Sequence, residues 1–514
     1  MKLLPIFLWF WQLPYERILH ADREPGNWLT YSGNYSSHHY SPLAQINRVN
    51  VPQLKLAWMY QARGREHFET MPLVFDGVMY ITDPPSDVTA LDLRTGRPLW
   101  HYRRAIPEGI AVCCGQINRG VAALDDQIFI ATIDAHVVAL DARTGRVRWD
   151  VQVADYKQAV TLTSAPLALK DKIIVGMAGA EYGVRGFLDA YDAKTGKRLW
   201  RTWTTDEKMW PGDSWKTGGA TTWVTGSYDP ELDLLYWGTG NPGPDYDGTV
   251  RAGDNLYSDS VIALEPSTGK FKWHFQFTPH DVNDMDSNQV PVLVDAVWQG
   301  KPRKLMFFAN RNGFYYVLDR ATGEFLHATP FARQNWAKGI DAKGRPIPTL
   351  ATTADAKGAL VYPDDDGTSN WFSPSYSPKT GFFYQNVREK GGYYYKADTT
   401  FQPGRMFLGA TKRDIPNEEG YGALRALRSL TGEKAWEFRT HSPPWCGVLA
   451  TAGDLVFSGT MEGDFFALDA WSGKLLWRFQ TGGEIWANPV SYRNEGKQYI
   501  AIAAGNSMLV FGLP

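Results

Sequence analysis

Cysteine is scarce in this chain of 514 residues, which contains only Cys113, Cys114 and Cys446. Three cysteines are too few for a disulfide framework, and their spacing matches no zinc motif. The C-x-x-C-H motif that attaches c-type haem is also missing, so the sequence excludes covalent haem on this chain.

An excess of charge of one sign is missing as well. Lys and Arg number 53 and Asp and Glu 55, which gives a formal net charge of −2. A strongly basic surface for nucleic acid or for an anionic membrane is therefore not expected. Apart from the N-terminus, no apolar run is long enough to cross a bilayer, so we expect no membrane span.

The N-terminus carries the one apolar run of note, KLLPIFLWFWQL at 2–13. Its single Lys and its length are typical of a signal-peptide core and too short for a membrane span. We therefore predict a signal peptide over 1–21, a mature domain over 22–514 and a periplasmic, exported protein. Leu19-His20-Ala21 offers a small residue at only one of the positions that cleavage requires, which leaves an unprocessed, packed arm as the alternative.

Turn-forming and aromatic residues are what the chain does have. It contains 49 Gly and 31 Pro, and aromatic residues make up 14%. This composition favours an all-β fold with many turns.

One phrase recurs along the sequence, for example VALDARTGRVRW (138–149) and FALDAWSGKLLW (466–477). It describes a strand that ends at Asp, a Thr-Gly or Ser-Gly turn that needs a positive φ, and a second strand that ends in Trp. Eight copies occur, two of them weak and one reduced to its turn. Their turn glycines lie 41 to 73 residues apart, at Gly96, Gly145, Gly196, Gly269, Gly323, Gly381, Gly432 and Gly473.

Repeats of this period are typical of propeller blades, which bury both faces of each sheet by packing in a ring. We predict an all-β, eight-bladed β-propeller with tryptophan-docking repeats, as a single domain. Trp58 and the C-terminal stretch QYIAIAAGNSMLVFGLP are expected to complete one blade together. Insertions are expected mainly at 205–260 and 333–370, and several separate β domains are the alternative.

The informative polar residues lie outside the repeat. Cys113 and Cys114 are adjacent in GIAVCCGQINRG (109–120). Two buried free thiols and, in an oxidising compartment, a strained vicinal disulfide are both compatible with this pair.

Three further stretches place oxygen-bearing side chains next to predicted strand ends. They contain Glu181 in 175–186, Asn241 in 234–248, and Asp281, Asp284 and Asp286 in 277–291. If these loops converge, they form a site for a hard cation. Solvated loop carboxylates are the alternative.

Taken together, these motifs resemble those of the pyrroloquinoline quinone (PQQ)-dependent alcohol dehydrogenases of the methanol and ethanol type. The resemblance rests on the eight-fold tryptophan repeat, the vicinal cysteines with Arg119 five residues on, and the phrases A-G-A-E-x-G-V-R-G (178–186), G-N-P (240–242) and H-D-x-x-D-x-D (280–286). It extends from about Gly26 to the C-terminus, with the motifs in the order of the family.

The resemblance implies a set of cofactor contacts. A disulfide between Cys113 and Cys114 would cover one face of PQQ, and Trp223 would stack on the other, unless Trp223 is one more blade tryptophan. Arg311 would reach the reactive carbonyl, with help from Asn386. The carboxylates and the edge of the cofactor would be held by Glu69, Arg119, Thr163, Ala178, Gly179 and Ala180.

The resemblance also implies a metal site and a catalytic base. Glu181, Asn241 and Asp284 would bind the ion, and Asp284 would accept the proton of the alcohol. Asp286 is typical of the lanthanide-using branch of the family, so a lanthanide ion is expected, with Ca²⁺ as the alternative. The chain departs from the family at Asn283, where a Trp usually precedes the base.

The function implied is oxidation of a small alcohol to an aldehyde or ketone. Because the chain lacks a haem motif, the electrons would pass to a separate, soluble c-type cytochrome. A non-catalytic scaffold of the outer-membrane protein assembly type and an enzyme that has lost its activity are the alternatives. The sequence leaves open the alcohol and whether the protein is a monomer or a homodimer, and it assigns Cys446 no role beyond a small buried residue.

Overall fold

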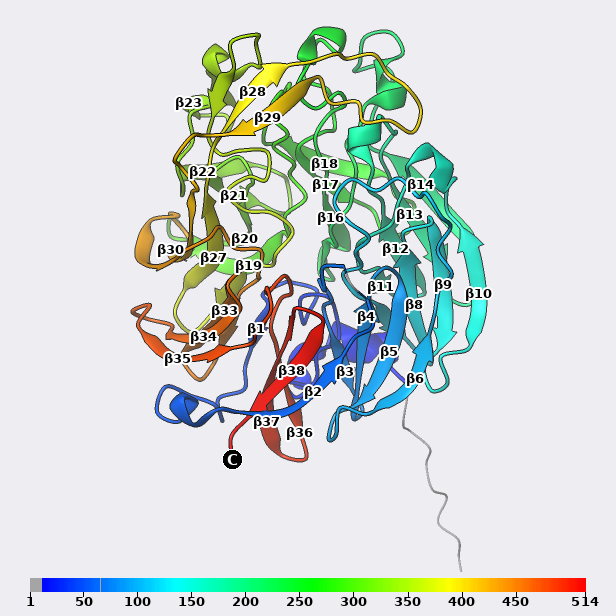
Figure 1. Ribbon diagram of the computed structural model, residues 1–514, viewed down its shortest axis with the longest axis vertical. Helices are drawn as coiled ribbons and strands as arrows, with labels where there is room; N and C mark the ends of the chain where they lie inside the picture. Colours follow the sequence, from blue (N-terminus) through cyan, green and yellow to red (C-terminus); the bar gives the residue numbers. More distant parts are fainter. Residues whose placement is uncertain (1–11, 65) are drawn as a thin grey trace, which may run out of the picture.

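The computed structural model describes residues 12–64 and 66–514. Strands follow one another around a ring (Figure 1), and in the described residues eight sheets contain four or five strands each. These sheets are the blades of the predicted all-β propeller.

The first five blades are antiparallel meanders of consecutive strands. The first blade contains β3 (Leu73–Phe75), β4 (Val78–Asp83), β5 (Asp87–Asp92) and β6 (Pro98–Tyr102), and the second contains β7 (Ala122–Leu124), β8 (Gln127–Thr132), β9 (His136–Asp141) and β10 (Val147–Gln152). The third contains β11 (Leu167–Leu169), β12 (Lys172–Gly176), β13 (Phe187–Asp192) and β14 (Arg198–Trp203), and the fourth contains β15 (Ser227–Asp229), β16 (Leu234–Gly238), β17 (Ser260–Leu264) and β18 (Phe271–Gln276). The fifth contains β19 (Val292–Trp298), β20 (Lys301–Ala309), β21 (Phe314–Asp319) and β22 (Phe325–Pro330).

The remaining three blades depart from this simple order. The sixth has a long insertion between its second and third strands, and the seventh gains β1 (Tyr40–Ser41) as a parallel edge strand. Their other strands are β26 (Ser375–Ser377), β27 (Phe382–Glu389), β30 (Tyr421–Arg428) and β31 (Lys434–Thr440) in the sixth, β32 (Leu449–Thr451), β33 (Leu455–Gly459), β34 (Asp464–Asp469) and β35 (Leu475–Gln480) in the seventh, and β36 (Val490–Asn494), β37 (Lys497–Ala504) and β38 (Ser507–Gly512) in the eighth.

The two ends of the chain close the ring, as predicted. β2 (Lys55–Gln61) pairs antiparallel with β38, and Trp58 lies opposite Val510. Figure 1 shows the blue β2 beside the red β38. Because strands from the two ends of the chain share one sheet, the edge of β38 is paired with β2 and the ring is closed.

The repeated tryptophan docks on the turn of the following blade. Trp100 lies over Gly145, where a Cβ would come within 2.5 Å of the Trp100 Cε3 atom, and its indole N–H donates to the Ala142 carbonyl at 3.0 Å. Gly145 has a φ of +68°, which L-residues with a Cβ adopt at a cost. The same contact joins Trp58 to Gly96, Trp149 to Gly196, Trp200 to Gly269, Trp273 to Gly323 and Trp436 to Gly473. The repeat thus fixes both the turn and the packing between neighbouring blades.

Insertions gather on one side of the ring and cover the site. The predicted insertions contain η5 (Ser214–Thr217) and η6 (Gly248–Val250) in 205–260, and β23 (Ala337–Ile340), β24 (Pro346–Pro348), η7 (Leu350–Thr352) and β25 (Ala359–Val361) near 333–370. The sequence did not predict the hairpin of β28 (Gly392–Lys396) and β29 (Ala410–Asp414), which pairs with β25. These strands lie together at the top of Figure 1.

The N-terminal arm packs on the propeller from Leu13 onward. Leu13 exchanges two backbone hydrogen bonds with Asp125, at 2.7 and 2.8 Å, and α1 (Tyr15–Leu19) follows. Arg17 forms ion pairs with Glu24 and Asp76 at 2.8 and 2.9 Å. Of the predicted signal segment 1–21, residues 1–11 lie outside the described residues. Within the described part of the chain, no helix has the length and apolar character of a membrane span.

Candidate functional site

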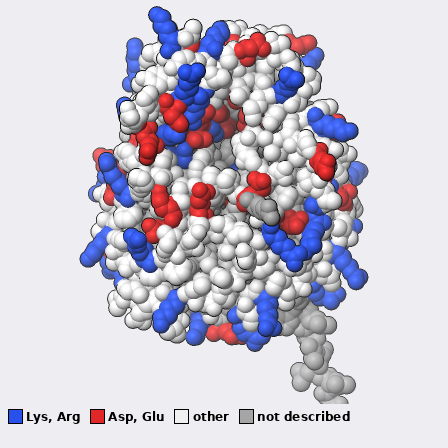
Figure 2. All heavy atoms as spheres, viewed as in Figure 1, with Lys and Arg blue, Asp and Glu red and all other residues white. Residues whose placement is uncertain are grey.

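The loops from several blades converge on one cavity of about 420 Å³. Figure 2 shows acidic side chains gathered in a hollow on this face of the molecule. The sequence-predicted residues that line the cavity are Glu69, Cys113, Cys114, Arg119, Thr163, Ala178, Gly179, Glu181, Trp223, Asp284, Asp286 and Arg311. The structure thus brings together side chains that are up to about 240 residues apart in the sequence.

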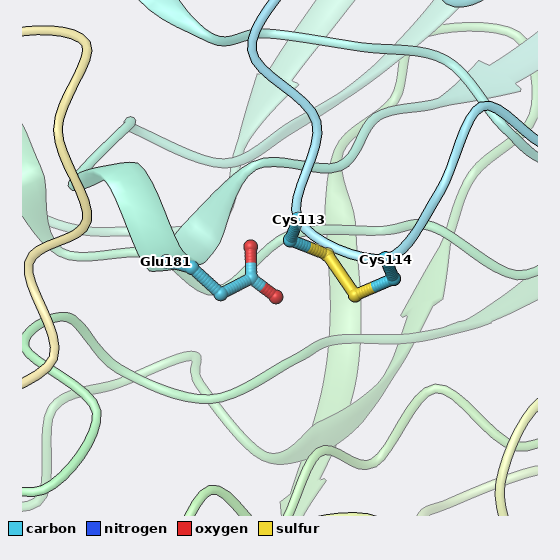
Figure 3. A group of neighbouring side chains, drawn as sticks. All are labelled: Cys113, Cys114 and Glu181. Atoms are coloured by element: carbon cyan, nitrogen blue, oxygen red, sulfur yellow. A yellow bond between two sulfur atoms is a disulfide. The ribbon is translucent and has the colours of Figure 1, made fainter. Parts of the chain in front are cut away.

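Cys113 and Cys114 form one wall of the cavity as a vicinal disulfide. This confirms the expected pairing over two free thiols. The loop that carries the disulfide is anchored because the Tyr182 hydroxyl donates to the Val112 carbonyl at 3.1 Å. In Figure 3 the carboxylate of Glu181, from η4 (Ala180–Tyr182), points toward the disulfide. Since the two sulfurs are bonded to each other, neither is a thiolate available to bind a metal.

Tryptophan and arginine side chains form a second wall. The guanidinium of Arg119 lies 5.1 Å from the ring centre of Trp223 and 4.9 Å from that of Trp371. The same guanidinium forms an ion pair with Glu69 at 2.8 Å and donates to the Thr163 hydroxyl at 3.0 Å. Burial raises the pKa of Glu69 to about 7, against the opposing effect of Arg119. These buried polar groups give the cavity an end that can bind carboxylates.

Backbone atoms approach closely where Ala178 and Gly179 border the cavity. Gly179 has a φ of +123°, and a Cβ at this position would lie 2.2 Å from the Ala159 carbonyl oxygen. Only glycine fits so tight a contact, which places η4 and Glu181 at the cavity wall.

Arg311 joins the two predicted acids of the 277–291 loop. Its Nη1 donates to Asp286 at 2.6 Å and its Nη2 to Asp284 at 3.2 Å. Asp286 also accepts a hydrogen bond from the indole N–H of Trp223 at 3.2 Å and one from the Asn241 backbone N–H at 2.7 Å. Asp286 therefore connects the aromatic wall to the acidic end of the cavity.

Burial dominates the electrostatics of this acidic end. It raises the pKa of Asp284 well above its usual value, against Arg311, while Asp286 and Asp245 add to the rise. Burial and the charge of Asp286 raise the pKa of Glu181 to about 7. A cation bound among these carboxylates would favour their charged forms and lower the same pKa values.

Several buried polar atoms of this region have no hydrogen-bond partner in the described chain. They include Glu181 Oε2, Asn241 Nδ2 and Asp245 Oδ1. Buried polar groups without partners are rare and costly in folded proteins. Carboxylate and amide oxygens around a cavity are the ligand set of a hard cation, so the residues present fit such an ion.

Asn386 is the predicted site residue that the structure does not bring to the cavity. It lies on β27, and its side-chain amide donates to the Cys446 carbonyl at 2.5 Å and to the Ser458 hydroxyl at 2.7 Å. The alternation of side chains along the strand turns Asn386 into the blade packing. Asn370, in the loop before β26, lines the cavity in its place.

Three other predicted residues lie just behind the cavity surface. Ala180 and Asn241 are buried and do not line the cavity themselves. Asn283, at the departure from the family pattern, is buried and donates to the Thr352 carbonyl in η7 at 2.9 Å. Cys446 is a buried free thiol, in agreement with its predicted role as a small core residue.

Sequence reasoning missed several lining residues. His67 stacks on Trp486 at 3.9 Å, and Trp486 stacks on Trp445 at 5.3 Å, which forms an aromatic wall. Asp245 follows Asn241 by four residues in the same phrase, and that proximity is the signal that could have found it. No comparable signal marked the other missed lining residues, among them Tyr246, Asp365, Asp366, Asn370 and Trp371.

A run of three acids at the cavity edge, 364–366, is paired with two cations. Asp364 pairs with Lys412 at 2.9 Å, and Asp366 with Arg388 at 2.9 Å. Lys412 also pairs with Asp365. This run is therefore an ion-pair network rather than a second cation site.

Comparisons with known proteins agree with the geometry. A model of the PQQ family, described as the glucose/ethanol/alcohol dehydrogenase β-propeller domain, matches residues 28–351 and 407–500. The chain is 39% identical to the quinoprotein alcohol dehydrogenase PedH of Pseudomonas putida, over 95% of this chain and 88% of PedH. It is 38% identical to a lanthanide-dependent methanol dehydrogenase of Methylacidiphilum fumariolicum, over 95% and 86% of the two chains.

Solved structures are similar over nearly the full length. A europium-containing methanol dehydrogenase superposes with a TM-score of 0.93 at 33% identity, covering 97% of this chain and all of that one. The likeness to BamB of Moraxella catarrhalis, with a TM-score of 0.50 at 16% identity, shows the fold alone.

Proposed function

The chain belongs to the family of PQQ-dependent quinoprotein alcohol dehydrogenases, and from this premise we propose which of its residues perform the oxidation of an alcohol. The observation that carries the proposal is the cavity in which the vicinal disulfide, Trp223, two buried arginines and several carboxylates face one another. A binding scaffold has no physical need for such a set.

The walls of the cavity fit PQQ, a flat quinone with carboxylate groups. The Cys113–Cys114 disulfide covers one face of the ring, and Trp223 covers the other. Arg119 and Thr163 would bind its carboxylates beside Glu69, and Arg311 would meet it next to Asp284 and Asp286. When bound, the quinone supplies a two-electron acceptor for the hydride of the alcohol carbon.

The acidic end holds the metal ion. Glu181, Asp284 and Asp286 provide carboxylate oxygens, and Asn241 provides its amide oxygen. We propose a lanthanide ion as the native metal, with Ca²⁺ as the alternative, because several anionic ligands in one buried place suit a trivalent ion. The relatives named as lanthanide-dependent and europium-containing support this choice.

Asp284 is the catalytic base in this proposal. It lines the cavity with a partly open side chain, and a cation beside it favours its charged form. In that form Asp284 accepts the hydroxyl proton of the alcohol while the carbon gives up its hydride. Arg311 holds Asp284 through its Nη2 and keeps the accepting oxygen in place. The stacked rings of Trp445 and Trp486 give the cavity an apolar surface for the carbon chain of the alcohol.

The two electrons then leave the protein to a separate carrier. We propose a soluble c-type cytochrome in the periplasm, because the sequence contains no haem-attachment motif. Small alcohols are the proposed substrates, in agreement with the names of the relatives.

The test is reconstitution of the purified apoprotein with PQQ and either Ca²⁺ or La³⁺, followed by dye-linked oxidation of primary, secondary and polyol substrates. Turnover that requires both PQQ and a metal supports the proposal. Tight PQQ binding without turnover on any alcohol would identify a chain that has lost its activity, and failure to bind PQQ would overturn the assignment of the cavity.

A further inference from the structure

Asp245 is a buried acid of the cavity that no cation of the described chain contacts directly. Its side chain is 1% exposed and lines the same cavity as Glu181, Asp284 and Asp286. Its Oδ1 atom has no hydrogen-bond partner, and in the described residues Asp245 forms no ion pair. An isolated buried carboxylate costs several kcal/mol unless a cation or a proton neutralises it.

The loop that carries Asp245 is fixed on both sides. The fully buried Arg251 donates from Nη2 and Nε to the Pro244 carbonyl, at 2.9 and 3.1 Å, and also donates to the Asp281 carbonyl. One guanidinium therefore ties the Asp245 loop to the loop of the catalytic base. On the other side, the Tyr246 backbone N–H donates to the Leu408 carbonyl at 2.8 Å. With its backbone held in this way, Asp245 cannot swing out to water.

The cations already present are engaged elsewhere. In the described chain, the arginines that line the cavity are Arg119, which pairs with Glu69, and Arg311, which binds Asp284 and Asp286. Arg251 donates to backbone carbonyls and to the Asn255 side chain. The charged neighbours of Asp245 are Glu181, Asp286 and, on the positive side, Arg251, which acts on it without a hydrogen bond. In the described residues no cation contacts the Asp245 carboxylate directly, so the place beside it is open to a bound ion.

We propose that Asp245 is a further ligand of the metal ion, in addition to Glu181, Asn241, Asp284 and Asp286. This inference rests on the proposed function, since it concerns the same ion. Asp245 adds a fourth carboxylate, and so one more negative charge, to the proposed ligand set, which favours a trivalent ion over Ca²⁺. Asp245 therefore contributes to selection of a lanthanide over calcium.

The test uses europium luminescence on the full-length apoprotein. Lifetimes measured in H₂O and in D₂O report the number of water molecules bound to Eu³⁺, and titration reports the affinity. Asp245→Asn keeps the size of the side chain and removes its charge, and Asp245→Ser guards against misfolding of a single variant. Asp247→Asn is the matched control, because Asp247 lies in the same loop and accepts from Thr249 in its own turn.

We expect both Asp245 variants to bind Eu³⁺ roughly 10- to 100-fold more weakly, while Ca²⁺ binding changes less. Asp245→Ser should admit about one more water molecule, whereas Asp245→Asn keeps an amide oxygen that can still reach the ion. Asp247→Asn should match the wild type. If the wild type binds Eu³⁺ and Glu181→Gln weakens it, while both Asp245 variants keep the wild-type affinity and hydration, the role of Asp245 is overturned and the metal site stands. If the wild type itself binds no Eu³⁺, the metal site and the role of Asp245 both fail.

Discussion

The indole N–H of Trp223 donates to the Oδ2 atom of Asp286 across 3.2 Å. The residue proposed to stack on the cofactor thus orients a residue proposed to bind the metal. Asp286 also accepts hydrogen bonds from Arg311 and from the Asn241 backbone N–H. One carboxylate therefore fixes the positions of Trp223, Arg311 and the Asn241 loop relative to one another. Cofactor binding and metal binding are therefore expected to be coupled.

Asp286→Ala is expected to separate lanthanide-supported from calcium-supported activity. Loss of one anionic ligand weakens a trivalent ion more than a divalent one, so La³⁺ affinity should fall roughly 10- to 100-fold with a smaller loss for Ca²⁺. The measurement is dye-linked turnover against the concentration of each metal. Trp223→Phe keeps an aromatic ring and removes only the N–H donor, so it should change La³⁺ affinity only a few-fold. Equal losses with both metals in Asp286→Ala would argue against a charge-based preference.

Asp284→Asn is expected to remove turnover and to keep PQQ bound. Asp284 has a φ of +57°, and Asn tolerates this left-handed backbone better than Ala does, so the substitution isolates the loss of the base. We expect kcat to fall by about 10²- to 10⁴-fold. Turnover is measured together with the absorbance of bound PQQ, and Asp247→Asn serves as the control from a neighbouring loop. Turnover near that of the wild type would show that another group accepts the proton.

Local repetition explains what the sequence predicted well. The turn at Gly145 and the indole of Trp100 are specified by residues that recur with each blade, so the ring and its closure by Trp58 followed from pattern alone. Asp245 and Asn370 occur once each, in loops whose path depends on tertiary contacts such as those of Arg251. Asn386 is the opposite case, a polar residue expected at the cofactor. Its strand directs the side chain into the packing between two blades instead.

The protonation of Glu69 is expected to make the free energy of unfolding of the apoprotein depend on pH. Its pKa is raised by burial to about 7, above the usual 4.5. The folded apoprotein therefore binds this proton more tightly than the unfolded chain does. The stabilisation is fully present below about pH 4.5 and is lost as the pH rises through 7.

Glu69→Gln removes the titratable carboxyl and, with it, this pH-dependent part of the free energy of unfolding. Relative to the variant, the wild-type apoprotein should lose roughly 2–3 kcal/mol of unfolding free energy between pH 4.5 and pH 8. Urea unfolding at a series of pH values measures this difference. A difference that stays constant across the range would mean that Glu69 is already charged at low pH in the folded protein.

Gly145→Ala tests the docking of the repeated tryptophan. The added Cβ would meet the Trp100 ring at 2.5 Å and would also be held at a φ of +68°. Gly381 provides a matched control, because its φ is +70° and nothing lies within 4 Å of a Cβ built there. We expect Gly381→Ala to cost about 1–2 kcal/mol for the backbone alone, and Gly145→Ala about 1–3 kcal/mol more for the displaced ring. Equal denaturation midpoints for the two variants would show that the indole contact adds nothing to the strain of the turn.

The packed N-terminal arm bears on where the predicted signal peptide would be cleaved. Leu13 and Ile18 are fully buried, and Arg17 forms one ion pair with Glu24 and one with Asp76 of the first blade. Cleavage after Ala21, as the sequence predicts, would remove all of these contacts and expose the apolar surface beneath them. We therefore expect the mature protein to begin before Leu13, which the intact mass of the protein purified from the periplasm would show. A chain engineered to begin at Asp22 should unfold at a lower temperature than one that begins at Gln12. If both unfold at the same temperature and the natural protein begins at Asp22, the predicted cleavage after Ala21 is correct.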